Sequence, residues 1–199
     1  LPYGFGGISS AKTEPGLVVC TTICKQDKDI VYRSFDYGTT WEPVLYDLSV
    51  GELAFRTSYM KPEFNGGHSL LHWLTDIKID PFNKDAAWFN SGTGVFRTKN
   101  LTSEKVVFED WSDGIEETVH LNVYSPNGGP VQVIDIVGDL GGFAFRDLTK
   151  PCKNSFEDEN GNRYITCLNA DYSEITPECF VTTARGNWTG KTKGGLVMT

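Results

Sequence analysis

The sequence has few basic residues and lacks a long hydrophobic run. Its 199 residues include 18 Lys and Arg against 26 Asp and Glu, for a formal charge of −8. Nucleic-acid binding needs a basic surface for the phosphates, so this balance excludes nucleic acid as the main partner. The longest apolar runs, such as residues 131–137, are broken by polar residues and are far shorter than the roughly 20 residues that cross a bilayer. We therefore expect a soluble globular domain with neither nucleic acid nor a membrane as its partner.

Cysteine and histidine are also scarce, with five and three residues respectively. Cys20 and Cys24 are four positions apart, but no histidine or second close cysteine pair lies near them to complete a zinc site. The odd number of cysteines leaves at least one without an intramolecular disulfide partner. We expect no metal and no cofactor.

Glycine, proline and aromatic residues are plentiful, with 21 Gly, 9 Pro, 12 Phe, 8 Tyr and 5 Trp. This composition favours short strands and tight turns over helices, and it predicts an all-β protein. Four segments share one form, in which two apolar runs flank a turn with proline and a third apolar run follows. The turn prolines are 66, 45 and 51 residues apart, at Pro15, Pro81, Pro126 and Pro177. A period near 45 to 50 residues is typical of β-propeller blades.

The repeats predict a partial β-propeller domain over residues 1–199, with about four blades. The fourth repeat stops at the chain end, and the first residues lack the basic start and apolar stretch of a secretion signal. We therefore expect the chain to be part of a longer protein. The blade-like repeats are predicted at residues 1–46, 68–112, 113–165 and 166–199, with an insertion at residues 47–67.

One segment carries a turn motif, the Asp-box S-x-D-x-G-x-T-W, formed by Ser34, Asp36, Gly38, Thr40 and Trp41. The aspartate can accept hydrogen bonds from turn amides, the glycine can adopt a positive φ, and the tryptophan can pack between strands. We predict a structural role in an outer blade turn, away from the ligand cleft. The motif is typical of sialidase-like and related glycosidase propellers.

Further blocks, in order along almost the whole chain, resemble glycoside hydrolase family 74, whose members cleave xyloglucan. The most specific are G-I-E-E-T at residues 114–118 and G-D-x-G-G-F at residues 138–143. The resemblance implies two seven-bladed propellers that face each other across a cleft, with one catalytic aspartate from each. It implies inverting hydrolysis of β-1,4-glucosidic bonds in the xyloglucan backbone, and an extracellular, secreted enzyme. The remaining blocks are residues 2–7, 34–41, 73–83, 92–94 and 100–102.

Asp139 is the candidate general acid, because by resemblance it matches the proton-donating aspartate of the second propeller. It follows the apolar run 131–137 and precedes Gly141 and Gly142, whose missing side chains would let a sugar ring approach the backbone. The alternative is that Asp139 only caps a turn. Asp135 is a poorer candidate, because it lies inside the strand, where it would line the propeller channel.

Inverting hydrolysis also needs a carboxylate that activates water, roughly 6.5–9.5 Å from the acid. The resemblance places this base in a D-x-G-G segment of the other propeller, and the chain has no second D-x-G-G. Glu116 and Glu117 cannot jointly flank one bond, because neighbours on a strand point to opposite faces. We therefore expect the isolated chain to be nearly inactive and to require a second propeller segment.

Sugar binding needs exposed aromatic faces, and tryptophan supplies the candidates. Trp73 fits the family's aromatic position at the cleft, where it either stacks on glucose or packs within the protein. Trp188 lies in a polar loop and is predicted to be exposed, whereas Trp41 and Trp88 are predicted to lie in the core. The substrate-binding candidates are thus Trp73, Trp188, Gly141, Gly142 and His72. For His72, we expect a local hydrogen bond and not a catalytic proton transfer.

Two other functions remain open at this point. A non-catalytic carbohydrate-binding propeller fragment would use the aromatic residues and leave Asp139 inert. A sialidase-like Asp-box protein would need an arginine cluster for the substrate carboxylate. Because the six arginines are spread along the chain, several at repeat positions, we do not expect such a cluster.

Ala144 and Phe145 also depart from the family pattern, which often has Arg-His there.

Overall fold

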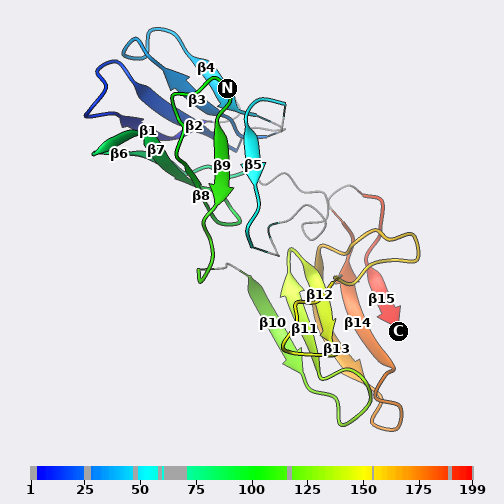
Figure 1. The fold of residues 1–199 in the computed structure, drawn as a ribbon. Helices are drawn as coiled ribbons and strands as arrows, with labels where there is room; N and C mark the ends of the chain where they lie inside the picture. The colour runs from blue at the N-terminus through cyan, green and yellow to red at the C-terminus, as the bar shows by residue number, and fades with distance from the viewer. Residues whose placement is uncertain are drawn as a thin grey trace. The chain divides into compact units, whose positions relative to one another are not determined.

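The computed structural model describes residues 4–24, 28–46, 49–57, 60, 71–115, 118–153, 155–187 and 190–198. Across these residues the chain forms fifteen strands in three sheets, numbered from β1 near the N-terminus to β15 near the C-terminus (Figure 1). The predicted all-β class is thus confirmed. Within the same ranges there is no helix with the length and apolar character of a membrane span.

The chain divides into two compact units, each with its own core. The first unit comprises Leu1–Met60 and Ser69–Glu117, and the second comprises Lys61–His68 and Thr118–Thr199. This division does not test the prediction that the chain is one partial propeller with four repeats, which stays a prediction.

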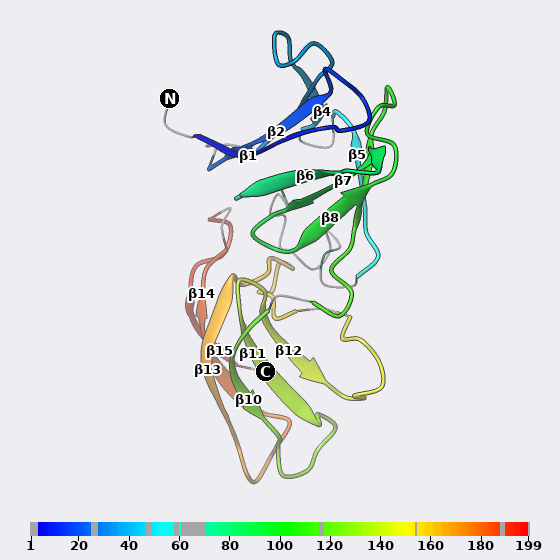
Figure 2. The ribbon, with the colours of Figure 1, turned by 90° about the vertical axis from the view of Figure 1, so that its left-hand side faces the viewer.

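The first sheet of unit 1 has four antiparallel strands in sequence order: β1 (Gly4–Ser10), β2 (Val18–Ile23), β3 (Val31–Ser34) and β4 (Glu42–Leu45). The second has the order β5-β9-β8-β7-β6: β5 (Glu52–Ala54), β6 (Asp76–Asp80), β7 (Asn83–Asn90), β8 (Val95–Thr98) and β9 (Val107–Asp110). Figure 2 shows β6, β7 and β8 as neighbours in one twisted sheet. β5 pairs in parallel with β9, so the stretch predicted to be an insertion supplies an edge strand.

The core of unit 1 is built by apolar side chains that alternate with more polar ones along these strands. Phe89, Phe96 and Phe108 lie on three adjacent strands and are at most 2% exposed, with ring centroids 5.0 Å apart in both the Phe89–Phe96 and Phe89–Phe108 pairs. Such aromatic pairs stabilise a core beyond the area that they bury. The two sheets meet closely at Gly7, where a Cβ atom would lie 2.4 Å from the backbone nitrogen of Ile77.

Unit 2 contains one six-stranded sheet made of two three-stranded antiparallel meanders. Their core contains Ile134, Ile136, Cys167 and Phe180. The meanders are joined by a single parallel register pair, Gly141 with Thr166. The strands are β10 (Val119–Tyr124), β11 (Val133–Gly138), β12 (Gly141–Phe145), β13 (Thr166–Tyr172), β14 (Phe180–Arg185) and β15 (Gly195–Met198).

The antiparallel pairs β1–β2, β6–β7, β10–β11 and β13–β14 lie where the sequence predicts hairpins around the turn prolines. The third apolar runs form β3, β8, β12 and β15. These elements were predictable because each depends on a local alternation of apolar and polar residues.

Candidate functional site

Asp139 lies with Leu140 in the tight turn between β11 and β12. Its φ of 63° is in the left-handed region, which aspartate adopts more readily than most residues. Its backbone N–H donates a hydrogen bond of 3.0 Å to Oγ1 of Thr166 on β13. The side chain is exposed, and its carboxylate forms no hydrogen bond or ion pair with any described residue. The turn therefore presents a free carboxylate to solvent.

Gly141 and Gly142 follow this turn and are both buried. A Cβ atom on Gly141 would lie 2.9 Å from the carbonyl oxygen of Tyr164. One on Gly142 would lie 2.7 Å from the ring of Phe156 and 2.8 Å from the carbonyl oxygen of Asp135. The chain itself thus fills the space beside each glycine that a side chain would occupy. Packing explains both glycines, and a role in substrate binding stays a prediction.

A hydrogen-bonded chain of three side chains connects β10 and β11 near the Asp139 turn. The carboxylate of Asp135, 11% exposed, accepts a hydrogen bond of 2.9 Å from Nδ1 of His120. Nε2 of His120 lies 2.7 Å from Oγ1 of Thr118. In the neutral imidazole a proton on Nδ1 leaves Nε2 as an acceptor, to which the threonine hydroxyl donates. Asp135 is therefore largely buried and held by His120, and its place along a propeller channel stays a prediction.

His120 and Thr118 are not among the residues that the sequence predicts for the site. His120 is paired across the strands with Val137, two residues before Asp139. That proximity depends on the β10–β11 register, which includes a bulge between His120 and Asn122. A bulge changes which residues of two strands face each other, and the local pattern of apolar and polar residues does not reveal it. The sequence therefore predicts that β10 and β11 pair, but not which residue of β10 meets Asp135.

Trp73, in unit 1, presents an exposed indole. Its φ is 54°, and the side chain is 58% exposed. The ring makes an edge contact with His72, with centroids 5.4 Å apart, and both rings lie over Gly92, where a Cβ atom would be 2.7 Å from Nε2 of His72. Strained backbone that holds an aromatic ring in solvent is a feature of binding sites. Trp188 lies outside the described residues, as do Glu116 and Glu117.

The Asp-box residues form a hydrogen-bonded turn after β3. Asp36 accepts hydrogen bonds from Oγ1 of Thr40 at 2.7 Å, from its backbone N–H at 2.8 Å and from Oγ of Ser34 at 2.8 Å. These bonds, led by the Thr40 hydroxyl, lower the pKa of Asp36 to about 2. Gly38 has a φ of 86°. A charged carboxylate here stabilises the turn, as a structural role requires.

Trp41 and Trp88, which were expected in the core, are not fully buried. Trp41 is 39% exposed, and its Nε1–H donates a hydrogen bond of 2.9 Å to the carbonyl of Gly38. The indole therefore covers the turn glycine instead of packing between strands, because its N–H needs an acceptor that the turn provides. Trp88 is partly buried on β7, beneath the guanidinium of Arg97.

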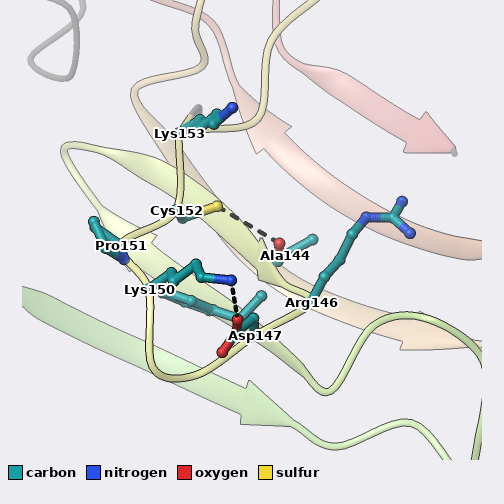
Figure 3. A pocket seen from close by; sticks show the side chains of 8 residues that line it. Ala144, Arg146, Asp147, Lys150, Pro151, Cys152 and Lys153 are labelled. Atoms are coloured by element: carbon teal, nitrogen blue, oxygen red, sulfur yellow. Dashed lines mark hydrogen bonds and ion pairs between the residues drawn. The ribbon is translucent and has the colours of Figure 1, made fainter.

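A cavity of about 380 Å³ lies at the end of β12 opposite to Asp139. Figure 3 shows Lys150 and Asp147 pointing toward each other, while Arg146 extends away from this pair. Their ion pair of 2.7 Å is the first cause of the lowered pKa of Asp147. The cavity does not include Asp139. Its lining residues are Ala144, Phe145, Arg146, Asp147, Lys150, Pro151, Cys152 and Lys153.

The five cysteines all lie in the described ranges, and none of them forms a disulfide. Cys20 and Cys167 are buried, and burial raises the pKa of both, to about 11 for Cys20. Cys24 and Cys179 are exposed. Across the ranges that the structure describes, His, Cys, Asp and Glu side chains form no group of three or more that could hold a metal ion.

Comparison with known proteins identifies relatives over most of the chain, although no family model matches it. A xyloglucanase of Paenibacillus sp. is 28% identical over 206 residues, covering 94% of this chain and 19% of the relative. A xyloglucanase of Acetivibrio thermocellus is 28% identical over 205 residues, covering 93% and 23%. An oligoxyloglucan-reducing end-specific xyloglucanase of Emericella nidulans is 28% identical over 183 residues, covering 74% and 23%.

Solved structures share the fold. The glycoside hydrolase family 74 xyloglucanase from Xanthomonas campestris matches with a TM-score of 0.75 and 23% identity, over 99% of this chain and 27% of that one. The family 74 enzyme of Niastella koreensis matches with a TM-score of 0.69 and 20% identity, over 97% and 28%. The chain thus spans between 19% and 28% of the length of these relatives. These comparisons confirm the resemblance read from the motifs: the chain is similar over most of its length to xyloglucanases and has the fold of part of a glycoside hydrolase family 74 propeller enzyme.

Proposed function

We propose that this chain is part of a secreted glycoside hydrolase that acts on xyloglucan, with Asp139 as the general acid of an inverting reaction. The observation that carries the proposal is the free, exposed carboxylate of Asp139 in a left-handed turn. The similarity to xyloglucanases over 94% of the chain supports the substrate class.

In this reaction Asp139 donates its proton to the glycosidic oxygen as the bond to the anomeric carbon breaks. Water, activated by a second carboxylate, attacks that carbon from the opposite face of the sugar. The second carboxylate comes from a propeller segment outside these 199 residues. Thr166 holds the backbone of the turn through its hydroxyl, which keeps the acid in one place while both bonds change.

Trp73 serves as a platform for a backbone sugar, because its indole is exposed and is held from below by Gly92. The apolar C–H face of a glucose ring packs on such an indole face. His72 orients the ring through its edge contact. Both residues act on binding, so their loss should raise KM more than it lowers kcat.

The test is Asp139→Asn in the full-length protein, with Asp147→Asn as the matched control. Asp147 lies in the same unit and is paired with Lys150 at the other end of β12. Loss of a general acid should lower kcat on xyloglucan by roughly 10²- to 10⁴-fold and leave binding intact. An aryl glycoside needs little protonation of its leaving group, so its hydrolysis should fall much less.

Full activity of Asp139→Asn on xyloglucan would overturn the assignment of the acid. An equal loss on both substrates would also count against it, because that pattern indicates a misfolded turn. Binding of xyloglucan without turnover by the wild-type full-length protein would establish a carbohydrate-binding module, for which the exposed Trp73 already provides a surface.

A further inference from the structure

Three cationic side chains of unit 1 surround a single indole ring, that of Trp111. Cζ of Arg56 lies 4.5 Å from the ring centroid, Cζ of Arg97 lies 5.0 Å from it, and Nζ of Lys99 lies 5.9 Å from it. Arg97 also lies over Trp88, 4.9 Å from that centroid. These five residues form what we call the Trp111 cluster. Two of the six arginines, Arg56 and Arg97, thus lie against one ring.

Strand register explains why residues so far apart in the sequence meet here. Arg97 on β8 pairs across the strands with Trp88 on β7 and with Glu109 on β9. Trp111 follows Glu109 by two residues and so points to the same face. Arg56 follows β5, the strand beside β9. The cluster therefore occupies one face of the sheet, and the buried phenylalanines occupy the other.

The positive charge of this cluster is not balanced within the described part of the chain. Arg56, Arg97 and Lys99 form no ion pair with any described residue, and Nε of Arg97 is buried without a hydrogen-bond partner. Glu109 shares the face but is bonded to none of them. Elsewhere in the same unit cations are neutralised, as in Lys78 with Asp76 at 2.6 Å.

An unpaired buried donor is unfavourable, and three like charges around one ring repel each other. In a protein with a net charge of −8, such a cluster is best accounted for by an anionic ligand. We propose that the Trp111 cluster binds the carboxylate groups of an acidic polysaccharide, a chain of uronic acid residues. The cluster consists of residues of unit 1, whereas Asp139 belongs to unit 2, and the proposal goes beyond the hydrolysis of xyloglucan.

The chemistry of the cluster fits such a ligand. The exposed guanidinium of Arg56, stacked on the indole, keeps its N–H edges free, and such edges bind a carboxylate through two parallel hydrogen bonds. Lys99 adds a point charge for a neighbouring carboxylate. Trp111 remains 38% exposed among the cations, so it offers an apolar surface for the C–H groups of the sugar. That surface favours a glycan over an acidic peptide.

The test is a titration of the full chain with oligogalacturonate at low salt, in which binding is monitored by tryptophan fluorescence. We expect saturable binding that weakens as salt rises, because surface charges are screened. Loss of a charge-assisted pair should weaken binding roughly tenfold in Arg97→Gln and in Arg56→Gln. Lys78→Gln, which removes a paired cation from the same sheet, should bind as the wild type does.

The methyl ester of the same oligogalacturonate supplies the matched ligand control, since it keeps the sugars and removes the charges. It should not bind. Equal binding of the ester, or an equal effect of Lys78→Gln, would overturn the proposal. Equally tight binding of polyglutamate would assign the cluster to an acidic peptide instead. Arg56 is exposed, so Arg56→Gln keeps the test valid if Arg97→Gln fails to fold.

Discussion

At the scale of single residues, the buried carboxylate of Asp135 depends on one imidazole. Within the described part of the chain its one side-chain partner is Nδ1 of His120, at 2.9 Å. Removing that partner leaves a buried acceptor unsatisfied, which typically costs about 1–3 kcal/mol. His120→Ala should lower the free energy of unfolding by about this amount in urea denaturation. His120→Asn, whose amide can donate from a similar position, should recover part of the loss; equal loss in both variants would contradict this account.

Asp36 makes the stability of unit 1 depend on pH in the acid range. Its pKa is lowered from 3.8 to about 2 by hydrogen bonds that favour the charged form. The stabilisation is therefore fully present above the unfolded-state pKa of 3.8, and it is lost as the pH falls toward 2. Urea denaturation of the wild type and Asp36→Asn should differ most above pH 4 and converge near pH 2. A constant difference across this range would contradict the prediction.

At the scale of elements, the turn that carries Asp139 depends on close packing behind it. A Cβ atom at Gly142 would lie 2.7 Å from the ring of Phe156 and 2.8 Å from a β11 carbonyl. Gly142→Ala should lower the free energy of unfolding by about 1–3 kcal/mol, the usual cost of overpacking. Gly195→Ala is the matched control, since nothing lies within 4 Å of the added atom. Comparable losses at the two glycines would refute this explanation.

The elements also show how far the sequence predicts the structure. The hairpins and the Asp-box turn could be predicted, because each is specified by residues close together in the chain. The parallel pairing of β5 with β9 and the Trp111 cluster could not, because they join segments more than 40 residues apart through strand register. For the same reason Asp139 could be proposed from its motif, whereas His120 and Thr118 on the neighbouring strand segment could not.

At the scale of the whole molecule, the two units have separate buried clusters, one that includes Phe89 and one that includes Ile134. Phe89→Ala should destabilise unit 1 by about 3–5 kcal/mol, as truncation of a buried phenylalanine typically does. Amide hydrogen exchange should then accelerate in β6 to β9 and stay unchanged in β10 to β15. Equal acceleration in both sets of strands would show that the units unfold as one.

The cysteine side chains allow the distance between the two units to be measured with dyes. Cys24 and Cys179 are exposed, one in each unit, whereas Cys20 and Cys167 are buried and have raised pKa values. Because thiolates are the species that react with maleimide dyes, the exposed pair should label well before the buried pair. With Cys152→Ser to remove the partly exposed fifth thiol, a donor and an acceptor dye on Cys24 and Cys179 would report by energy transfer how the two units are arranged in solution, and whether xyloglucan changes that arrangement.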